Sequence, residues 1–289
     1  MIELNALDQH DLIQNWDFFS SNPPSRYQLS RIRSRLFLRS RFPQFLPLKE
    51  VFLFPQWTVF FIFLPQAILS NSQRYTLDAL KKSKRKLFVI CASESPKDIP
   101  EEIFKKSDAL YWKALQGFDF SAYTIGFHEI ARSSPDSEVF FLNDSVFGPL
   151  RDIDKTLELM NWNFTGFSAS SQFENHIQSY AFHLSNVSMP VIEDLGDVLS
   201  KSFSYNDIWS TVSCCETRLA RVASKKMSVG SLYFSNCDRI DPTLDLALPL
   251  LERGFPFVKK SLFGKHFGRT NEALLWQRMV DVGYPSTAF

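Results

Sequence analysis

The sequence predicts an α/β protein with a Rossmann-type, mostly parallel sheet flanked by helices and a helical C-terminal portion. From residue 57 onward, apolar runs of strand length alternate with amphipathic segments, as in βαβ units. The chain has 289 residues, of which 45% are hydrophobic and 22% charged, so it is long and apolar enough to bury a full core.

Composition narrows the classes of partner and compartment. The net charge of +1 gives no overall field that would attract nucleic acid, and none is expected as a partner. The 29 Phe residues predict an aromatic-rich core, with an apolar surface for a membrane or a partner as the alternative. No C-x-x-C pair occurs among the four Cys residues, and the N-terminus lacks the pattern of a signal peptide. We therefore expect reduced thiols in a cytoplasmic protein.

The first fifty residues predict a basic N-terminal extension, followed by one domain over residues 51–289. Residues 1–25 predict an irregular or short helical lead that ends at a Pro-Pro pair. Residues 26–42 predict a helix with an arginine every fourth residue and apolar side chains on another side. Such a helix suits an anionic membrane surface, and a solvated arginine face is the alternative.

Residues 51–73 carry no charged side chain, and the segment is long enough for a membrane-spanning helix to be one interpretation. Pro55 and Pro65 oppose a helix there, and the β-branched and aromatic run between them favours a buried central strand. This strand is predicted at residues 57–64. Further strands are predicted at residues 86–93, 108–114, 137–144, 163–170 and 179–185. The helices between and after them are predicted at residues 73–85, 121–134, 152–160, 190–202, 214–227 and 271–283.

Polar residues follow two of these strands, where ligands of parallel sheets bind. Asp144, between Asn143 and Ser145, is a candidate ligand for Mg²⁺ or Mn²⁺ on a diphosphate, and an Asx-turn is the alternative. Asp119 comes two residues after Gly117 and just before a helix, where an acid caps free N–H groups or meets a ligand.

Three later groups could complete a site. Strand alternation predicts His176, Gln178 and Tyr180 on one face, suited to sugar hydroxyls, with His176 as a candidate base and a core histidine as the alternative. Glu216 is predicted at the front of a helix, as a base or as a charge that the helix dipole favours. Lys259 lies among aromatic residues, where it could hold a diphosphate or simply be solvated.

Five stretches together resemble the rhamnan synthesis F family of bacterial glycosyltransferase-like proteins, over roughly residues 55–265. They are "GFDFSAYTIGF", "FFLNDSVFGPL", "HIQSYAFHLS", "CETRLA" and "PFVKKSLFG". The resemblance implies a GT-A-like fold in which Asp144 falls where a metal-binding D-x-D motif is expected. It implies catalytic roles for Glu216 and His176. The implied donor-binding residues are Lys113, Gly117, Asp119, Tyr123, Asn143, Ser145, Gln178 and Lys259.

Two departures from the family pattern bear on this expectation. The Asn143–Ser145 stretch keeps one acid where D-x-D has two, and Lys113 and Leu115 stand where the family has Arg and Asn. The function expected from the resemblance is transfer of a sugar, with dTDP-rhamnose as one candidate donor, to a lipid-linked or polymeric glycan at the inner face of the plasma membrane. A non-catalytic scaffold of polysaccharide assembly is the alternative, which the departures favour.

Overall fold

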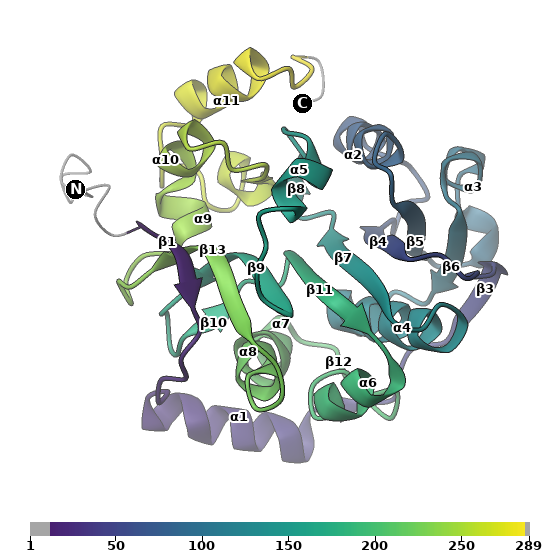
Figure 1. Ribbon diagram of the computed structural model, residues 1–289, viewed down its shortest axis with the longest axis horizontal. Helices are drawn as coiled ribbons and strands as arrows, with labels where there is room; N and C mark the ends of the chain where they lie inside the picture. The colour runs from purple at the N-terminus through teal and green to yellow at the C-terminus, as the bar shows by residue number, and fades with distance from the viewer. Residues whose placement is uncertain (1–11, 287–289) are drawn as a thin grey trace.

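The computed structural model describes residues 12–286, in which a twisted central sheet is covered by helices on both faces (Figure 1). Its strands follow the order β1-β13-β9-β11-β7-β4-β5-β6-β3, with β10 beside β9. They are β1 (Leu12–Asp17), β3 (Phe45–Lys49), β4 (Gln56–Phe63), β5 (Lys86–Ala92), β6 (Ala109–Lys113), β7 (Ser137–Asn143), β9 (Phe164–Ser170), β10 (His176–Ile177), β11 (Ala181–Val187) and β13 (Val229–Ser235).

Four neighbouring strands of this sheet form a parallel block, both edge strands are antiparallel, and one antiparallel strand, β11, lies inside the sheet. Neighbours β7, β4, β5 and β6 run parallel, as do β9 and β13, while β11, β1 and β3 run against their neighbours. The predicted α/β class with a mostly parallel sheet is therefore confirmed. From β4 the chain builds β5 and β6 on one side, and it then crosses to β7 on the other side. Such a reversal leaves a crevice at the carboxyl ends of the strands.

Alternating side chains of the central strands feed two hydrophobic cores. Trp57, Val59 and Phe61 of β4 face α4, α6 and α8, whereas Phe60 and Ile62 face α2, α3 and α5. These helices are α2 (Asn71–Lys81), α3 (Glu101–Lys106), α4 (Phe118–Ser133), α5 (Ile153–Leu157), α6 (Met189–Leu195) and α8 (Thr217–Ala223). A third core joins α9 (Pro242–Asp245), α10 (Ala247–Glu252) and α11 (Glu272–Asp281), as expected for a helical C-terminal portion.

The N-terminal part of the chain is tied into the main sheet. Helix α1 (Ser25–Phe37) forms, but it ends five residues before the predicted end at residue 42, because β2 (Arg39–Ser40) pairs with β12 (Ser204–Tyr205). The irregular or short helical lead was wrong for Leu12–Asp17, which is β1 and pairs with β13. Strand β3 pairs with β6 at the opposite edge. Long-range pairing decides both strands, and local sequence patterns do not contain it. The boundary at residue 50 stays a prediction, and residues 1–11 lie outside the described residues.

The uncharged stretch over residues 51–73 is the buried strand β4 followed by a turn, as the prolines indicate. None of the helices between residues 12 and 286 combines the length and the apolar composition that a bilayer crossing requires.

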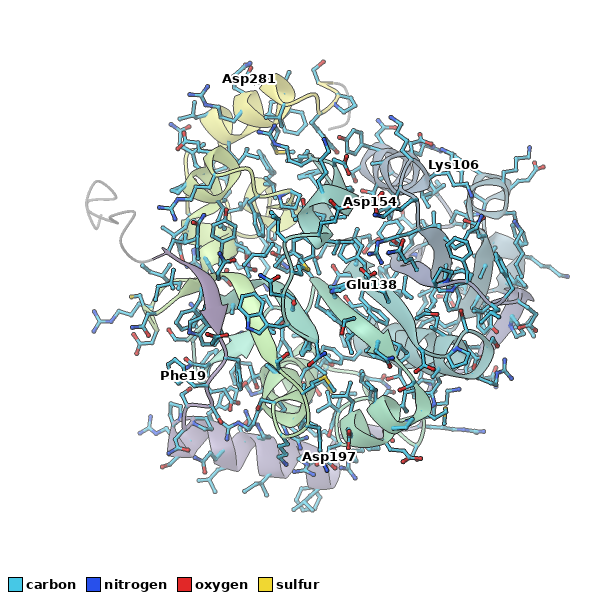
Figure 2. All side chains as sticks on the ribbon, in the orientation of Figure 1. Phe19, Lys106, Glu138, Asp154, Asp197 and Asp281 are labelled. Atoms are coloured by element: carbon cyan, nitrogen blue, oxygen red, sulfur yellow. The ribbon has the colours of Figure 1, made fainter. Side chains whose placement is uncertain are left out.

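Buried charges also gather at the amino ends of the parallel strands. The Glu138 carboxylate at the start of β7 accepts hydrogen bonds from Gln56 Nε2 at 2.9 Å and from the Arg85 guanidinium, and it pairs with His183 Nε2 at 2.8 Å. Arg85 Nε also lies 3.6 Å from a carboxylate oxygen of Asp154 in α5. Figure 2 labels Glu138 and Asp154 in this region. We call these five residues the amino-end network.

Candidate active site

A cavity of about 610 Å³ opens at the crevice predicted from the strand order, and we call it the first cavity. Its walls come from the ends of β4 and β7, the loop between β6 and α4, and the helical segment over residues 208–216. Several predicted site residues line it, namely Gly117, Asp119, Asn143, Asp144, Ser145, Glu216 and Lys259. The structure therefore brings together residues that lie up to 142 positions apart, from Gly117 to Lys259.

Lys113, the last residue of β6, holds the loop that follows this strand. This side chain is buried, and its Nζ donates to the carbonyl oxygens of Ala114 at 2.9 Å and Gln116 at 2.8 Å. Burial lowers the pKa of Lys113 to about 7, against the attraction of Asp119. Gly117 has φ of +84°, which a glycine adopts without strain, and its N–H donates to Asn206 Oδ1 at 3.0 Å. Lys113 thus shapes the loop and does not line the cavity.

Asp119 lies in the first turn of α4 and points toward the end of β7. Its Oδ2 accepts a hydrogen bond from Asn143 Nδ2 at 2.9 Å, and its Oδ1 accepts one from the Phe120 N–H at 2.9 Å. Burial, and then repulsion from Glu216, raise its pKa to about 6, although the Asn143 amide opposes this shift. The Asp119 carboxylate is therefore more easily protonated than a carboxylate that only caps a helix, because the N-terminus of a helix favours the charged form.

The Asn143–Ser145 stretch forms the Asx-turn that was the alternative to a site. Asn143 Oδ1 accepts from the Ser145 N–H at 3.1 Å and from Ser145 Oγ at 2.6 Å. Asp144 Oδ2 accepts from the Phe63 N–H at 3.0 Å and from Gln73 Nε2 at 2.6 Å. Burial raises the pKa of Asp144, and Lys260 opposes the shift. The turn and the cavity wall are the same structure, so the two interpretations do not exclude each other.

Lys259 reaches the cavity through a short pairing of β14 (Val258–Lys259) with β8 (Val146–Phe147). Its Nζ lies 3.3 Å from Ser145 Oγ and 4.2 Å from the centroid of the Tyr180 ring. Burial lowers the pKa of Lys259, while Glu216, Asp241 and Asp119 oppose the shift. The Lys259 ammonium can donate to a phosphate oxygen in the cavity, while the three carboxylates partly offset its positive charge.

Glu216 directly precedes α8, as predicted, but a helical segment that was not predicted leads into it. Helix α7 (Ile208–Thr211) continues into a π-helical turn over Val212–Glu216 and then into α8. Such turns are frequent at functional sites. Glu216 Oε1 accepts from the Ser179 N–H at 2.8 Å, and Tyr123 OH donates to the Ser179 carbonyl at 2.8 Å. Tyr123 is fully buried and supports the wall from behind.

A second cavity of about 300 Å³ adjoins the first and shares four lining residues with it: Ser145, Val212, Glu216 and Lys259. His176 and Gln178 line this second cavity together with Asp241 and His266. The prediction of one strand face for His176, Gln178 and Tyr180 was wrong, because β10 ends at Ile177 and β11 begins at Ala181. Tyr180 consequently lines the first cavity instead.

Hydrogen bonds fix the side chains of the second cavity. Gln178 holds Ser168 Oγ at 2.7 Å and Asp241 Oδ1 at 3.0 Å. His176 Nδ1 lies 2.8 Å from the Glu174 carbonyl oxygen, which makes Nδ1 the donor and Nε2 the basic nitrogen. Burial lowers the pKa of His176, against the attraction of Glu216 and Asp241. His176 is therefore neutral and fixed in orientation.

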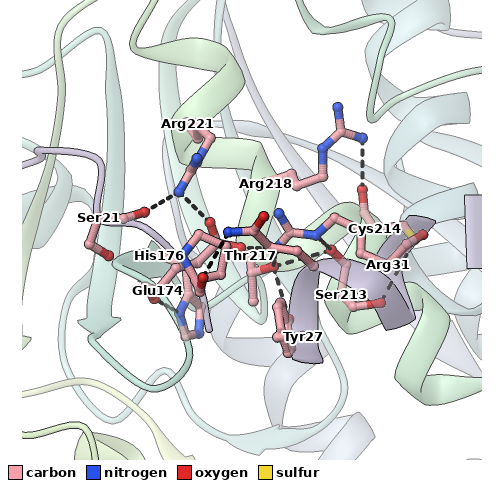
Figure 3. Close-up of polar contacts among 12 residues, drawn as sticks. Ser21, Tyr27, Arg31, Glu174, His176, Ser213, Cys214, Thr217, Arg218 and Arg221 are labelled. Carbon is pink, nitrogen blue, oxygen red and sulfur yellow. Dashed lines mark hydrogen bonds and ion pairs between the residues drawn. The ribbon is translucent and has the colours of Figure 1, made fainter. Parts of the chain in front are cut away.

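Behind His176, the loop is clamped by two arginines on one buried carboxylate (Figure 3). The Glu174 side chain is fully buried and pairs with the Arg31 guanidinium and, at 2.5 Å, with Arg221 NH2. Arg31 Nε also donates to the Ser213 carbonyl at 2.7 Å, within the π-helical turn. This clamp of Glu174, Arg31 and Arg221 joins α1 to the loop before His176 and to the π-helical turn. Both segments line the second cavity.

The residues at the end of β7 fit a divalent cation only where a ligand completes the coordination. Asp144 supplies one carboxylate, and in the described part of the chain no three His, Cys, Asp or Glu side chains gather closely enough to hold a metal ion. Mg²⁺ bound between protein and a diphosphate needs one or two carboxylates, so Asp144 is sufficient in that case alone.

Sequence reasoning missed several lining residues. Asp241 and Asn206 stand in stretches that look like ordinary helix caps, and Phe61, Phe63 and Phe173 look like core or loop residues. The Asp-Pro pair at 241 does cap α9, with Asp241 Oδ1 accepting from the Thr243 N–H at 2.9 Å. No local pattern separates such a cap from a cavity wall.

Comparison with known proteins shows to which family the sequence is similar. The sequence matches the family model described as rhamnan synthesis protein F over residues 87–285, so the resemblance is confirmed. No curated protein matches the sequence.

Among solved structures, 4-diphosphocytidyl-2C-methyl-D-erythritol synthase from Anaerococcus prevotii is similar with a TM-score of 0.42 and 11% identity, covering 69% of this chain and 96% of that one. The inositol-1-phosphate CTP transferase from T. maritima has a TM-score of 0.41 and 8% identity, covering 80% and 98%. The glycosyltransferase GlyE from Streptococcus pneumoniae has a TM-score of 0.39 and 12% identity, covering 81% and 66%.

Proposed function

The chain belongs to the rhamnan synthesis protein F family, and on this basis we propose that it transfers a hexosyl group from a nucleotide sugar to a growing cell-surface polysaccharide. The observation that carries the proposal is the junction of two cavities at Glu216 and Lys259. A transferase has to hold two substrates on either side of one reacting carbon. A pair of cavities that share a carboxylate and an ammonium meets that need.

The first cavity takes the nucleotide sugar. Phe61 and Phe63 and the Gly117 loop offer apolar surface and backbone to the nucleoside, with the Asp119 carboxylate as an acceptor for sugar hydroxyls. The diphosphate lies beside Lys259, whose Nζ supplies donors and is held in place by Ser145 Oγ as an acceptor. A divalent cation bound by Asp144 would add positive charge to the leaving diphosphate.

The second cavity takes the acceptor, whose hydroxyls His176, Gln178 and Asp241 can bond. Glu216 Oε1 is fixed by the Ser179 N–H, and Glu216 Oε2 accepts the proton of the attacking hydroxyl. The bond from the acceptor oxygen to the anomeric carbon forms as the bond from that carbon to the diphosphate oxygen breaks. The diphosphate leaves with the electron pair, and Lys259 stabilises the charge that it acquires. His176 Nε2 is the alternative base.

The test is transfer by the purified chain from a panel of labelled nucleotide sugars, dTDP-rhamnose among them, to lipid-linked glycan. We expect one donor to be used, and Asp144→Ala to reduce its turnover. Calorimetry against the same panel, with and without Mn²⁺, separates this proposal from a scaffold. Saturable donor binding without transfer or donor hydrolysis would identify a non-catalytic binding protein and contradict the proposal.

A further inference from the structure

Helix α1 presents its apolar side to solvent and its polar side to the protein. The residues that face inward are Tyr27, Arg31 and Ser34, of which Tyr27 and Ser34 are buried. Leu29, Ile32 and Leu36 are 67%, 53% and 68% exposed. Their spacing of three and four residues places them in one stripe on the outer face of the helix. An ordinary surface helix has the opposite arrangement, with its apolar stripe toward the core.

The orientation of α1 is fixed by the clamp behind the second cavity. Arg31 donates to the Ser213 carbonyl, pairs with buried Glu174 and donates to Thr217 Oγ1 at 3.0 Å (Figure 3). Tyr27 OH lies 3.1 Å from the same Thr217 oxygen. The helix therefore cannot rotate to bury its leucines without removing Arg31 from the buried Glu174 carboxylate and leaving it with Arg221 as its remaining arginine, which is costly.

Cations flank the outer stripe, and the segment of chain that carries it has no acidic residue. Arg26 and Arg33 are exposed, and about 100° of rotation per residue places them along one side of the stripe. The sequence has no acidic residue between Asp17 and Glu50. Phe37, which is 75% exposed, extends the apolar surface at the end of the helix. An apolar stripe beside arginines is the arrangement of helices that lie in the plane of an anionic membrane interface.

Helix α1 lies beside residues that line both cavities. Phe173 stacks on the inward-facing Tyr27 with ring centroids 4.8 Å apart, is 44% exposed and lines the second cavity. Trp209 Nε1 donates to Ser30 Oγ at 3.0 Å, and its neighbour Ile208 is 63% exposed and lines the first cavity. Exposed apolar side chains next to α1 therefore belong to the walls of both cavities.

We propose that the outer face of α1 docks on an anionic lipid bilayer, with Leu29, Ile32, Leu36 and Phe37 in the interface and Arg26 and Arg33 on the headgroups. A second copy fits this face poorly, because a two-fold contact would set the same arginines against one another. The lipid contact stands on the geometry of α1 alone. Its consequence, that a lipid-linked acceptor enters the second cavity from the membrane, rests on the proposed function.

The test is co-sedimentation of the full chain with phosphatidylcholine vesicles, with and without one quarter phosphatidylglycerol. We expect binding to the anionic vesicles and its loss at high salt. Arg26→Gln with Arg33→Gln should weaken binding roughly twentyfold. Leu29→Ser with Leu36→Ser should weaken it by about tenfold or more. The matched controls, Arg151→Gln with Arg239→Gln and Leu53→Ser with Leu159→Ser, replace four exposed residues outside α1 and should change binding little.

Equal binding to neutral and anionic vesicles, or no effect of the α1 variants, would overturn the proposal. So would self-association in solution that the Leu29 and Leu36 changes abolish, because the occupant would then be a second copy. Melting curves of each variant exclude unfolding as the cause. Calorimetry with soluble nucleotide sugars keeps the two proposals apart, since α1 variants should bind donor normally, and a wild-type chain that binds vesicles without binding donor refutes only the proposed function.

Discussion

Strand β7 carries a buried polar cluster at each of its ends, and the two clusters differ in how their charges are balanced. At its start, Glu138 in the amino-end network is surrounded by Arg85, His183 and Gln56. Burial alone would raise the pKa of Glu138, but these partners hold it well below its ordinary range. At the other end of β7, the pKa of Asp119 is raised to about 6 by burial and by Glu216.

The difference separates a structural network from a binding site. The Glu138 carboxylate of the amino-end network has internal partners that stabilise its charge without a ligand. The carboxylates of the first cavity repel each other across open volume and lower the stability of the empty protein. Groups held in an unfavourable state beside a cavity are typical of functional sites. Variants at the two ends of β7 should therefore have opposite effects on stability.

The largest effect is expected from Glu216→Gln on sugar transfer. The amide keeps an oxygen for the Ser179 N–H but cannot take a proton, so kcat should fall about a thousandfold with donor affinity nearly unchanged. Steady-state kinetics measure both, and the melting temperature should not fall below that of the wild type, because the change also removes a charge that repels Asp119. Glu252→Gln, on the exposed surface of α10, is the matched control. Turnover that survives in the variant would move the role of base to His176.

Glu138→Gln should have the largest effect on folding. It leaves the buried Arg85 guanidinium with a weaker set of partners, so the free energy of unfolding at neutral pH should fall by about 3 kcal/mol. Because the pKa of Glu138 is depressed in the folded protein, its contribution is full above the ordinary glutamate range and is lost as the pH falls. Urea titrations should show the gap from the wild type narrowing in acid. A gap that widens there contradicts this assignment.

Asp119→Asn should have the smallest effect on folding, and it should be stabilising. The folded protein raises the pKa of Asp119 from 3.8 to about 6, so its charge is disfavoured in the folded state above pH 6. Removing the charge should add about 1 kcal/mol to the free energy of unfolding at pH 7, and nothing below the unfolded pKa. The same change should weaken donor binding about tenfold, measured by calorimetry. A variant that loses stability at pH 7 would make Asp119 a structural cap.

The sequence predicted the parts of the site that follow from strand order. Asp119 and Asn143–Ser145 each follow a parallel strand, and the carboxyl ends of such strands meet at one edge of the sheet. Lys259 was a candidate, but its position depends on a two-residue pairing with β8, for which no local pattern exists. The π-helical turn that contains Glu216 likewise has no sequence signal.

The orientation of α1 shows the same limit. The periodicity predicted its helix and its separate apolar and basic sides, but hydrophobic spacing by itself places an apolar side toward the core. The structure reverses this because Glu174, far along the chain, binds Arg31 from the inside. Buried ion pairs between distant residues decide such orientations, and a single sequence does not reveal them.

The most direct test of the account is a crystal structure of the chain soaked with a nucleoside diphosphate such as dTDP. We expect the diphosphate beside Lys259 Nζ and Ser145 Oγ, with the nucleoside against Phe61 and the Gly117 loop. A nucleotide bound outside the first cavity, or a first cavity left empty at saturating nucleotide, would contradict the account.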